Sequence, residues 1–110
     1  MILALDKCGA LSVFASVDET QRALEAIDVF QDCVEFCDER GQRYLPTYER
    51  VPKVSKLGVV DIGAFTLTKE GDVDSGLPLA FAERAEHIET SSVSSVRTLE
   101  DLIAALKHRS

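Results

Sequence analysis

The chain has 110 residues, of which 45% are hydrophobic, and its 12 Lys and Arg against 19 Asp and Glu give a formal net charge of −7. This size and apolar content predict one packed domain over residues 1–110 and exclude a disordered tail. The acidity argues against nucleic acid or an anionic membrane as the partner, since both attract clustered Lys and Arg. It suits a basic protein partner, and it equally suits a surface that is acidic only to remain soluble.

Two short strands are predicted near the N-terminus, over residues 2–5 and 10–15, with a turn between them in which Gly9 is free to take a positive φ. A capping box follows at Ser16–Glu19, and apolar residues then recur at helical spacing. The pattern predicts a helix over about residues 17–27. Its inward face consists of Val17, Thr20, Ala23, Leu24 and Ile27.

The middle of the chain is typical of β-structure. Strands are predicted over residues 34–36, 43–48 and 57–68. Gly41 closes the turn between the first two, at a position that favours positive φ. Pro46 has no N–H, so its strand lies at a sheet edge or bends there. Residues 53–56 are predicted to form a basic loop, and Gly58 and Gly63 interrupt the third strand, as a bulge would.

Two helices are predicted in the last third of the chain, over residues 79–88 and from residue 98 onward. Pro78 is tolerated in the first turn of the earlier helix, and Thr98 is a capping-type residue at the start of the later one. A Ser- and Thr-rich loop over residues 90–95 connects them. The later helix has an apolar stripe, and cations lie at its negative end, where they are favoured: Lys107, His108 and Arg109.

The elements therefore occur in the order ββαβββαα. Strands joined by short turns imply a mostly antiparallel sheet of four to five strands. About three helices, each with a single apolar stripe, are expected to cover one face of that sheet. The predicted fold class is α+β, with two layers.

No catalytic, metal-binding or cofactor-binding constellation is recognisable in the sequence. Cys33 and Cys37 lack the spacing of a zinc knuckle, and His87 and His108 are predicted on different helices. Neither a nucleophile motif nor a phosphate-binding glycine pattern occurs. The chain is therefore expected not to be an enzyme and to bind no metal or cofactor.

Cys8, Cys33 and Cys37 form an odd set, which suits a reducing compartment. If Cys33 and Cys37 share one extended strand, a rise of about 3.3 Å per residue separates them by roughly 13 Å, beyond the roughly 7 Å that a disulfide spans. All three are predicted to be free thiols. The sequence has no convincing secretion signal and no membrane-spanning run, so the chain is predicted to be cytoplasmic.

Acidic side chains are the candidates for partner binding. Residues 1–45 and 70–110 carry net charges of −5 and −4, whereas residues 46–69 carry +2, so an acidic face is expected from the two ends of the sequence. The candidate partner-binding residues are Asp32, Glu35, Asp38 and Glu39 on a predicted strand and turn, followed by Asp72 and Asp74 in a later turn. Nothing in the sequence indicates the burial that would tune the pKa of a catalytic carboxylate. A solvated turn is therefore a better interpretation of these residues than a catalytic pair.

Three stretches carry a resemblance to a known group of proteins: Val13–Ser16, Ala23–Val29 (Ala-Leu-Glu-Ala-Ile-Asp-Val) and Glu35–Tyr44 with its Asp-Glu-Arg-Gly turn. Over about residues 13–45 the chain resembles small bacterial immunity proteins of polymorphic toxin systems, of the type VI secretion and contact-dependent inhibition kind. The resemblance implies a protein that binds a cognate antibacterial toxin domain, such as a basic nuclease, and blocks its active site. It transfers no site residues, because the shared residues are structural and such proteins bind diverse toxins through variable surfaces.

Two other classes of function remain open. The first is an adaptor or regulatory module that binds a different cytoplasmic protein. The second is a small-ligand binder, or an enzyme whose site forms only in the folded chain or in a dimer. A toxin gene beside this one would favour the immunity hypothesis, and a deep pocket with convergent polar groups would favour the ligand or enzyme hypothesis.

Overall fold

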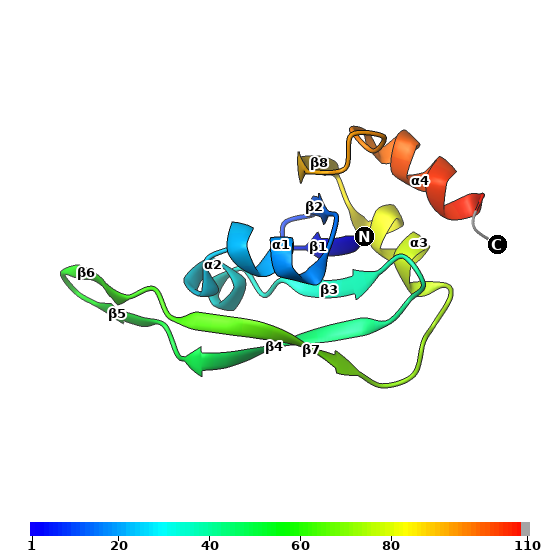
Figure 1. Ribbon diagram of the computed structural model, residues 1–110. Helices are drawn as coiled ribbons and strands as arrows, with labels where there is room; N and C mark the ends of the chain where they lie inside the picture. Colours follow the sequence, from blue (N-terminus) through cyan, green and yellow to red (C-terminus); the bar gives the residue numbers. More distant parts are fainter. Residues whose placement is uncertain (109–110) are drawn as a thin grey trace.

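The structure, a computed structural model, describes residues 1–108, so Arg109 lies outside the described residues (Figure 1). The helices are α1 (Val17–Ala23), α2 (Ala26–Gln31), α3 (Leu77–Arg84) and α4 (Leu99–Lys107). The strands are β1 (Ile2–Leu5), β2 (Ala10–Phe14), β3 (Glu35–Asp38), β4 (Arg43–Arg50), β5 (Lys53–Ser55), β6 (Gly58–Asp61), β7 (Ala64–Glu70) and β8 (His87–Ser91). Their order is ββααβββββαβα rather than the expected ββαβββαα.

Six strands form one mixed sheet in the order β7-β4-β3-β1-β2-β8. Neighbouring strands are antiparallel except β2 and β8, which run parallel. Strands β5 and β6 form a separate two-stranded sheet. The predicted α+β class and the mostly antiparallel sheet are confirmed, but the part of the chain that the structure describes contains more strands and one more helix than expected.

Helices cover both faces of the large sheet, so the fold has three layers and the two-layer prediction is wrong. Side chains of β1 point alternately to the two faces. Ile2 and Ala4 pack with residues of α1 and α2. Leu3 and Leu5 pack with residues of α3 and α4. All four are buried, and an uninterrupted apolar run of this kind is typical of a strand that is covered on both faces.

The helix predicted over residues 17–27 is in fact two helices. The Ser16 side chain accepts a hydrogen bond from a backbone N–H of the first turn, as a cap does, but the backbone becomes extended at Leu24 and α2 begins two residues later. Ala26 and Val29 are buried although both lie off the predicted apolar stripe. The break turns α2 so that these side chains also reach the sheet.

The prediction of a helix over residues 79–88 is also wrong at the C-terminal end of the helix. α3 stops at Arg84, and His87 belongs to β8, which takes up part of the predicted Ser- and Thr-rich loop. β8 is a short edge strand whose partner β2 lies far away in the sequence, so no local pattern identifies it. By contrast, α4 begins where predicted, with a capping box formed by Thr98 and Asp101.

The strand predicted over residues 57–68 is divided into β6 and β7 at Gly63, and the basic loop predicted at residues 53–56 contains β5. Gly63 has a φ of +80°, and a β-carbon there would lie 2.7 Å from the Arg50 carbonyl oxygen. Both the backbone and the space therefore require glycine. Pro46 lies in the part of β4 that pairs with β7 only, which accommodates its missing N–H.

Candidate functional site

Strands β5 and β6 form an arm that projects from the ends of β4 and β7, away from the rest of the molecule (Figure 1). We use the name arm for residues 50–63. The molecule measures 47 × 27 × 21 Å, and the arm extends its longest dimension. Strands β5 and β6 pair with each other and with no other strand of the described chain, so both outer edges of the arm are open.

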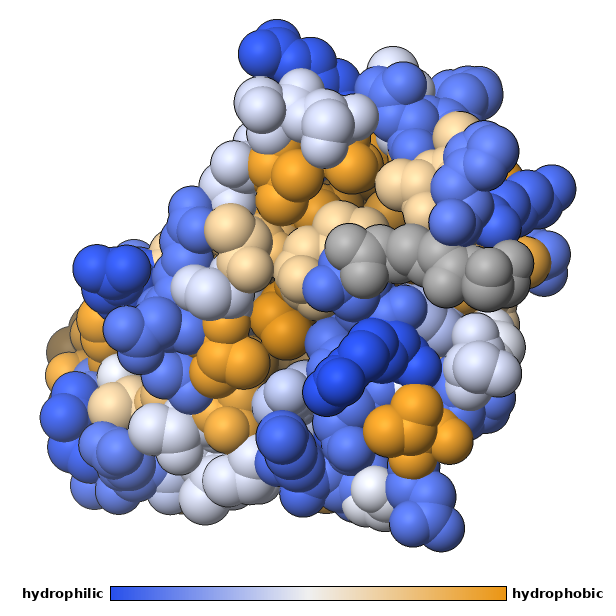
Figure 2. Space-filling view, turned by 45° about the vertical axis from the view of Figure 1, so that its right-hand side comes forward, coloured by the Kyte–Doolittle hydropathy of each residue, from blue (hydrophilic) through white to orange (hydrophobic). Residues whose placement is uncertain are grey.

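The arm exposes most of its apolar side chains. Six of its residues have exposed fractions between 48% and 100%: Val51, Val54, Leu57, Val59, Val60 and Ile62. Leu57, between the two strands, is the fully exposed one. On the face seen in Figure 2, by contrast, apolar side chains lie mostly in a band between charged and polar ones. An apolar surface that projects into solvent is typical of a contact with another protein.

An ion pair and hydrogen bonds fix the base of the arm. The Arg50 guanidinium lies 3.3 Å from the Asp61 carboxylate on the opposite side of the hairpin. That carboxylate also accepts a hydrogen bond of 2.8 Å from the Gly63 N–H. The bond from Gly63 and the bonds from Arg50 lower the pKa of Asp61, because both favour its charged form. The arm is therefore joined to the body through a bonded base rather than a loose loop.

Apolar surface continues from the arm onto the body. Phe30, on α2, is 54% exposed, and its ring packs edge-on against Tyr48 of β4 with the ring centroids 5.8 Å apart. This pair lies near the root of the arm, because β4 ends at Arg50 (Figure 1). A partner that contacts the arm on this side therefore also meets α2.

A groove lies beside α2, on the face of the sheet formed by β1, β2 and β8. We call this cavity of about 310 Å³ the acidic groove. Small side chains contribute to its lining: Ala4, Ala10 and Ser12. Three larger apolar side chains also line it: Leu24, Val29 and Val34. Four carboxylates complete it: Asp6, Asp28, Asp32 and Glu89. Glu89 falls at the register shift between β8 and β2, and a bulge of this kind redirects a side chain.

The acids predicted from sequence as partner-binding residues do not form one patch. Asp32 lies in the acidic groove, at the end of α2. Glu35 lies on β3 between two guanidinium groups, ion-paired with Arg84 and, at 3.8 Å, with Arg43. Its charge is therefore partly balanced within the chain.

At the other end of β3, two of the predicted acidic segments meet. Asp38 accepts two backbone hydrogen bonds within its own turn, and Glu39 lies 3.2 Å from the N-terminal amino group. The Asp74 N–H donates a hydrogen bond of 3.0 Å to the Gly41 carbonyl, which holds the loop before α3 against this turn. Asp72 is exposed in the same loop. The fold thus brings the Asp38 turn and the Asp74 loop together, and it leaves Asp32 elsewhere.

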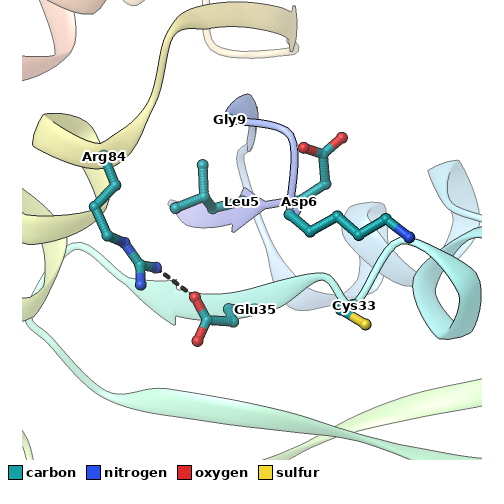
Figure 3. Close-up of a pocket in the computed structure, with 7 residues that line it drawn as sticks. Leu5, Asp6, Gly9, Cys33, Glu35 and Arg84 are labelled. Carbon is teal, nitrogen blue, oxygen red and sulfur yellow. Dashed lines mark hydrogen bonds and ion pairs between the residues drawn. The ribbon is translucent and has the colours of Figure 1, made fainter.

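A second pocket lies at the end of β1 and contains chemically varied side chains (Figure 3). Arg84 and Glu35 point toward each other there, whereas the Asp6 carboxylate and the Cys33 thiol point away from that pair (Figure 3). Cys33 lies before β3 with a φ of +51°, so Cys33 and Cys37 do not share one extended strand. The side chains of this pocket do not converge on a common point.

The thiols and imidazoles offer little chemistry in this fold. Cys37 is buried, and burial raises the pKa of its thiol to about 12, with neighbouring carboxylates adding to the effect. Cys8 and Cys33 are exposed, and the described chain contains no disulfide. His87 and His108 are both exposed. Within residues 1–108, no group of His, Cys, Asp or Glu side chains is placed to hold a metal ion.

Comparison with protein-family models, with curated proteins and with solved structures finds no match to this chain. Of the helices in residues 1–108, none has the length and apolar character needed to cross a bilayer.

Proposed function

We propose that this domain works by binding another protein through the arm and the adjoining surface of α2. We further propose that the partner is an antibacterial toxin domain in the cytoplasm, whose active site the bound domain covers. The observation that carries the proposal is the row of six exposed aliphatic side chains on a projecting hairpin. Their contact with water is unfavourable and would be relieved by a partner. The resemblance of residues 13–45 to immunity proteins supports the choice of partner.

The acidic groove supports a basic partner. Asp28 lies on α2 and Asp32 directly follows its last residue, and the same helix carries Phe30 at the root of the arm. A basic toxin would be steered toward these carboxylates, and its apolar surface would then meet the arm. In such an interface the arm contributes buried apolar area, whereas the carboxylates contribute association rate and specificity.

Growth of cells that express the product of a neighbouring toxin gene tests the proposal. We expect the wild-type domain to restore growth and to copurify with the toxin. The double variant Leu57→Asp, Val59→Asp should lose both properties, because it places charges in an apolar contact. Val73→Asp is a matched control, since Val73 lies in the loop before α3 and is 55% exposed, against 54% for Val59.

Two outcomes contradict the proposal separately. Full protection by the Leu57→Asp, Val59→Asp variant would exclude the arm from the interface. A neighbouring toxin that the wild-type domain neither binds nor neutralises would exclude the immunity function and favour an adaptor role. Circular dichroism of the variants checks that folding is unchanged, as expected for side chains that are already exposed.

A further inference from the structure

We propose that the arm of one copy docks in the acidic groove of a second copy, so that the free protein is a homodimer. Two surfaces from separate parts of the chain carry this inference: an apolar, basic hairpin and an acidic groove lined in part by small residues. Neither surface needs a toxin to be present. The dimer therefore goes beyond the proposed function, and it is tested without any toxin.

The charges of the two surfaces are opposite. The arm carries three basic side chains and one acidic one, a net charge of +2, which leaves −9 on the other residues out of the total of −7. Lys53 and Lys56 are exposed and form no ion pair among the described residues. Among the described residues the groove carboxylates of Asp28 and Glu89, which are exposed, and of Asp32, which is half-buried, form no ion pair either. A second copy of this chain thus offers the arm a complementary surface.

Among the described residues, no cation of the same copy forms an ion pair with these carboxylates, so they can pair with the lysines of a second copy. Lys7 is a basic residue close to the end of α2, and its ammonium group donates a hydrogen bond of 2.9 Å to the Gln31 carbonyl. That carbonyl lies at the negative end of α2, where a cation is favoured. Asp6 accepts backbone hydrogen bonds from its own turn, so the other three carboxylates are the ones expected to contact a partner's lysines.

The lining of the groove suits the tip of the arm. Ala4 and Ala10 leave space beneath α2, and the cavity of about 310 Å³ is large enough for an aliphatic side chain. Leu57 is fully exposed and directly follows Lys56. Because lysine stems are apolar and flexible, the tip can place Leu57 on the alanines while the ammonium group of Lys56 reaches the carboxylates.

Symmetry would close this contact into a dimer. Each copy has one arm and one groove, so a two-fold axis lets each copy give its arm and receive the other's. Pairing of two arms edge to edge is less favourable, because it would bring the lysines of both copies together. The groove is therefore the preferred site for the arm.

Sedimentation equilibrium of the full chain over a wide concentration range tests the proposal. We expect a monomer–dimer equilibrium that weakens as salt rises. Lys53→Glu with Lys56→Glu, and separately Asp28→Lys with Asp32→Lys, should each raise the dimer dissociation constant by roughly tenfold or more. Heterodimers of the two variants, in which reversed arms meet reversed grooves, should recover to within about threefold of the wild type. Glu70→Lys with Asp72→Lys is a control at the opposite end of β7.

Other results would overturn the proposal. A chain that stays monomeric at every concentration has no such dimer. A dimer that the arm reversal weakens and the groove reversal leaves unchanged would place the arm on a different surface. Loss of affinity in both variants without recovery in the mixture would exclude a direct contact between the lysines and these carboxylates. Glu89→Lys, on β8 instead of α2, repeats the test if the α2 variant does not fold.

Discussion

Replacing Gly41 by alanine tests how the β3–β4 turn and the loop before α3 hold each other. Gly41 has a φ of +97°, and a β-carbon there would lie 1.7 Å from the Asp74 carbonyl oxygen. A left-handed backbone costs a residue with a β-carbon about 1–2 kcal/mol. Relieving the contact displaces the loop and breaks the hydrogen bond from the Asp74 N–H to the Gly41 carbonyl, which contributes about 0.5–1.5 kcal/mol. We therefore predict that Gly41→Ala lowers the free energy of unfolding by about 1.5–3.5 kcal/mol.

Gly71→Ala is the matched control for this prediction. Gly71 also has a positive φ, of +68°, but no atom lies within 4 Å of the position that its β-carbon would take. Its replacement should cost only the backbone contribution of about 1–2 kcal/mol. Urea denaturation followed by circular dichroism measures both free energies. Equal losses in the two variants would refute the reasoning, because the contact with the Asp74 loop would then contribute nothing.

At neutral pH, a thiol reagent is expected to modify Cys8 and Cys33 quickly and Cys37 only after unfolding, because burial keeps the Cys37 thiol protonated. Rapid modification of all three thiols in the folded protein would place Cys37 outside the core. The pKa of Asp101 is lowered mainly by a hydrogen bond from the Arg97 N–H, so folding favours its charged form. That stabilisation is complete above the ordinary pKa of 3.8 and is lost as the pH falls through the lower folded value. Asp101→Asn should therefore be less stable than the wild type at neutral pH and converge with it in acid, and a constant difference across the titration would contradict this.

Sequence motifs correctly predicted those features of the fold that depend only on residues close together in the chain. Ser16 and Thr98 mark the starts of two helices, and Gly9 and Gly41 take the positive φ expected of them, because each acts within a single turn. β8 and the second covered face of the sheet depend on segments that are far apart in the chain. The apolar run of β1 was the one local sign of burial on both faces.

Some residues of the candidate site could likewise be predicted from local spacing, whereas others come together only through the tertiary fold. Asp28 of α2 and Asp32, the residue that caps its C-terminus, are four residues apart, a spacing that places both on one side and that could have predicted part of the acidic groove. Glu89 joins them only through the pairing of β8 with β2. The arm was not predicted because strand patterns do not show whether another element covers the strand. Residues 57–68 contain both β6, which is mostly exposed, and the inner part of β7, which packs in the core.

Removal of the outer part of the arm is the most direct test of the claim that the arm binds the partner. Strands β5 and β6 form a sheet of their own, so an Asn-Gly turn can replace residues 53–60 without removing a strand from the large sheet. We predict a melting temperature close to that of the wild type and a rise of roughly hundredfold or more in the dissociation constant for the proposed toxin partner, measured by calorimetry. A shortened chain that folds and binds the toxin as tightly as the wild type would contradict the claim.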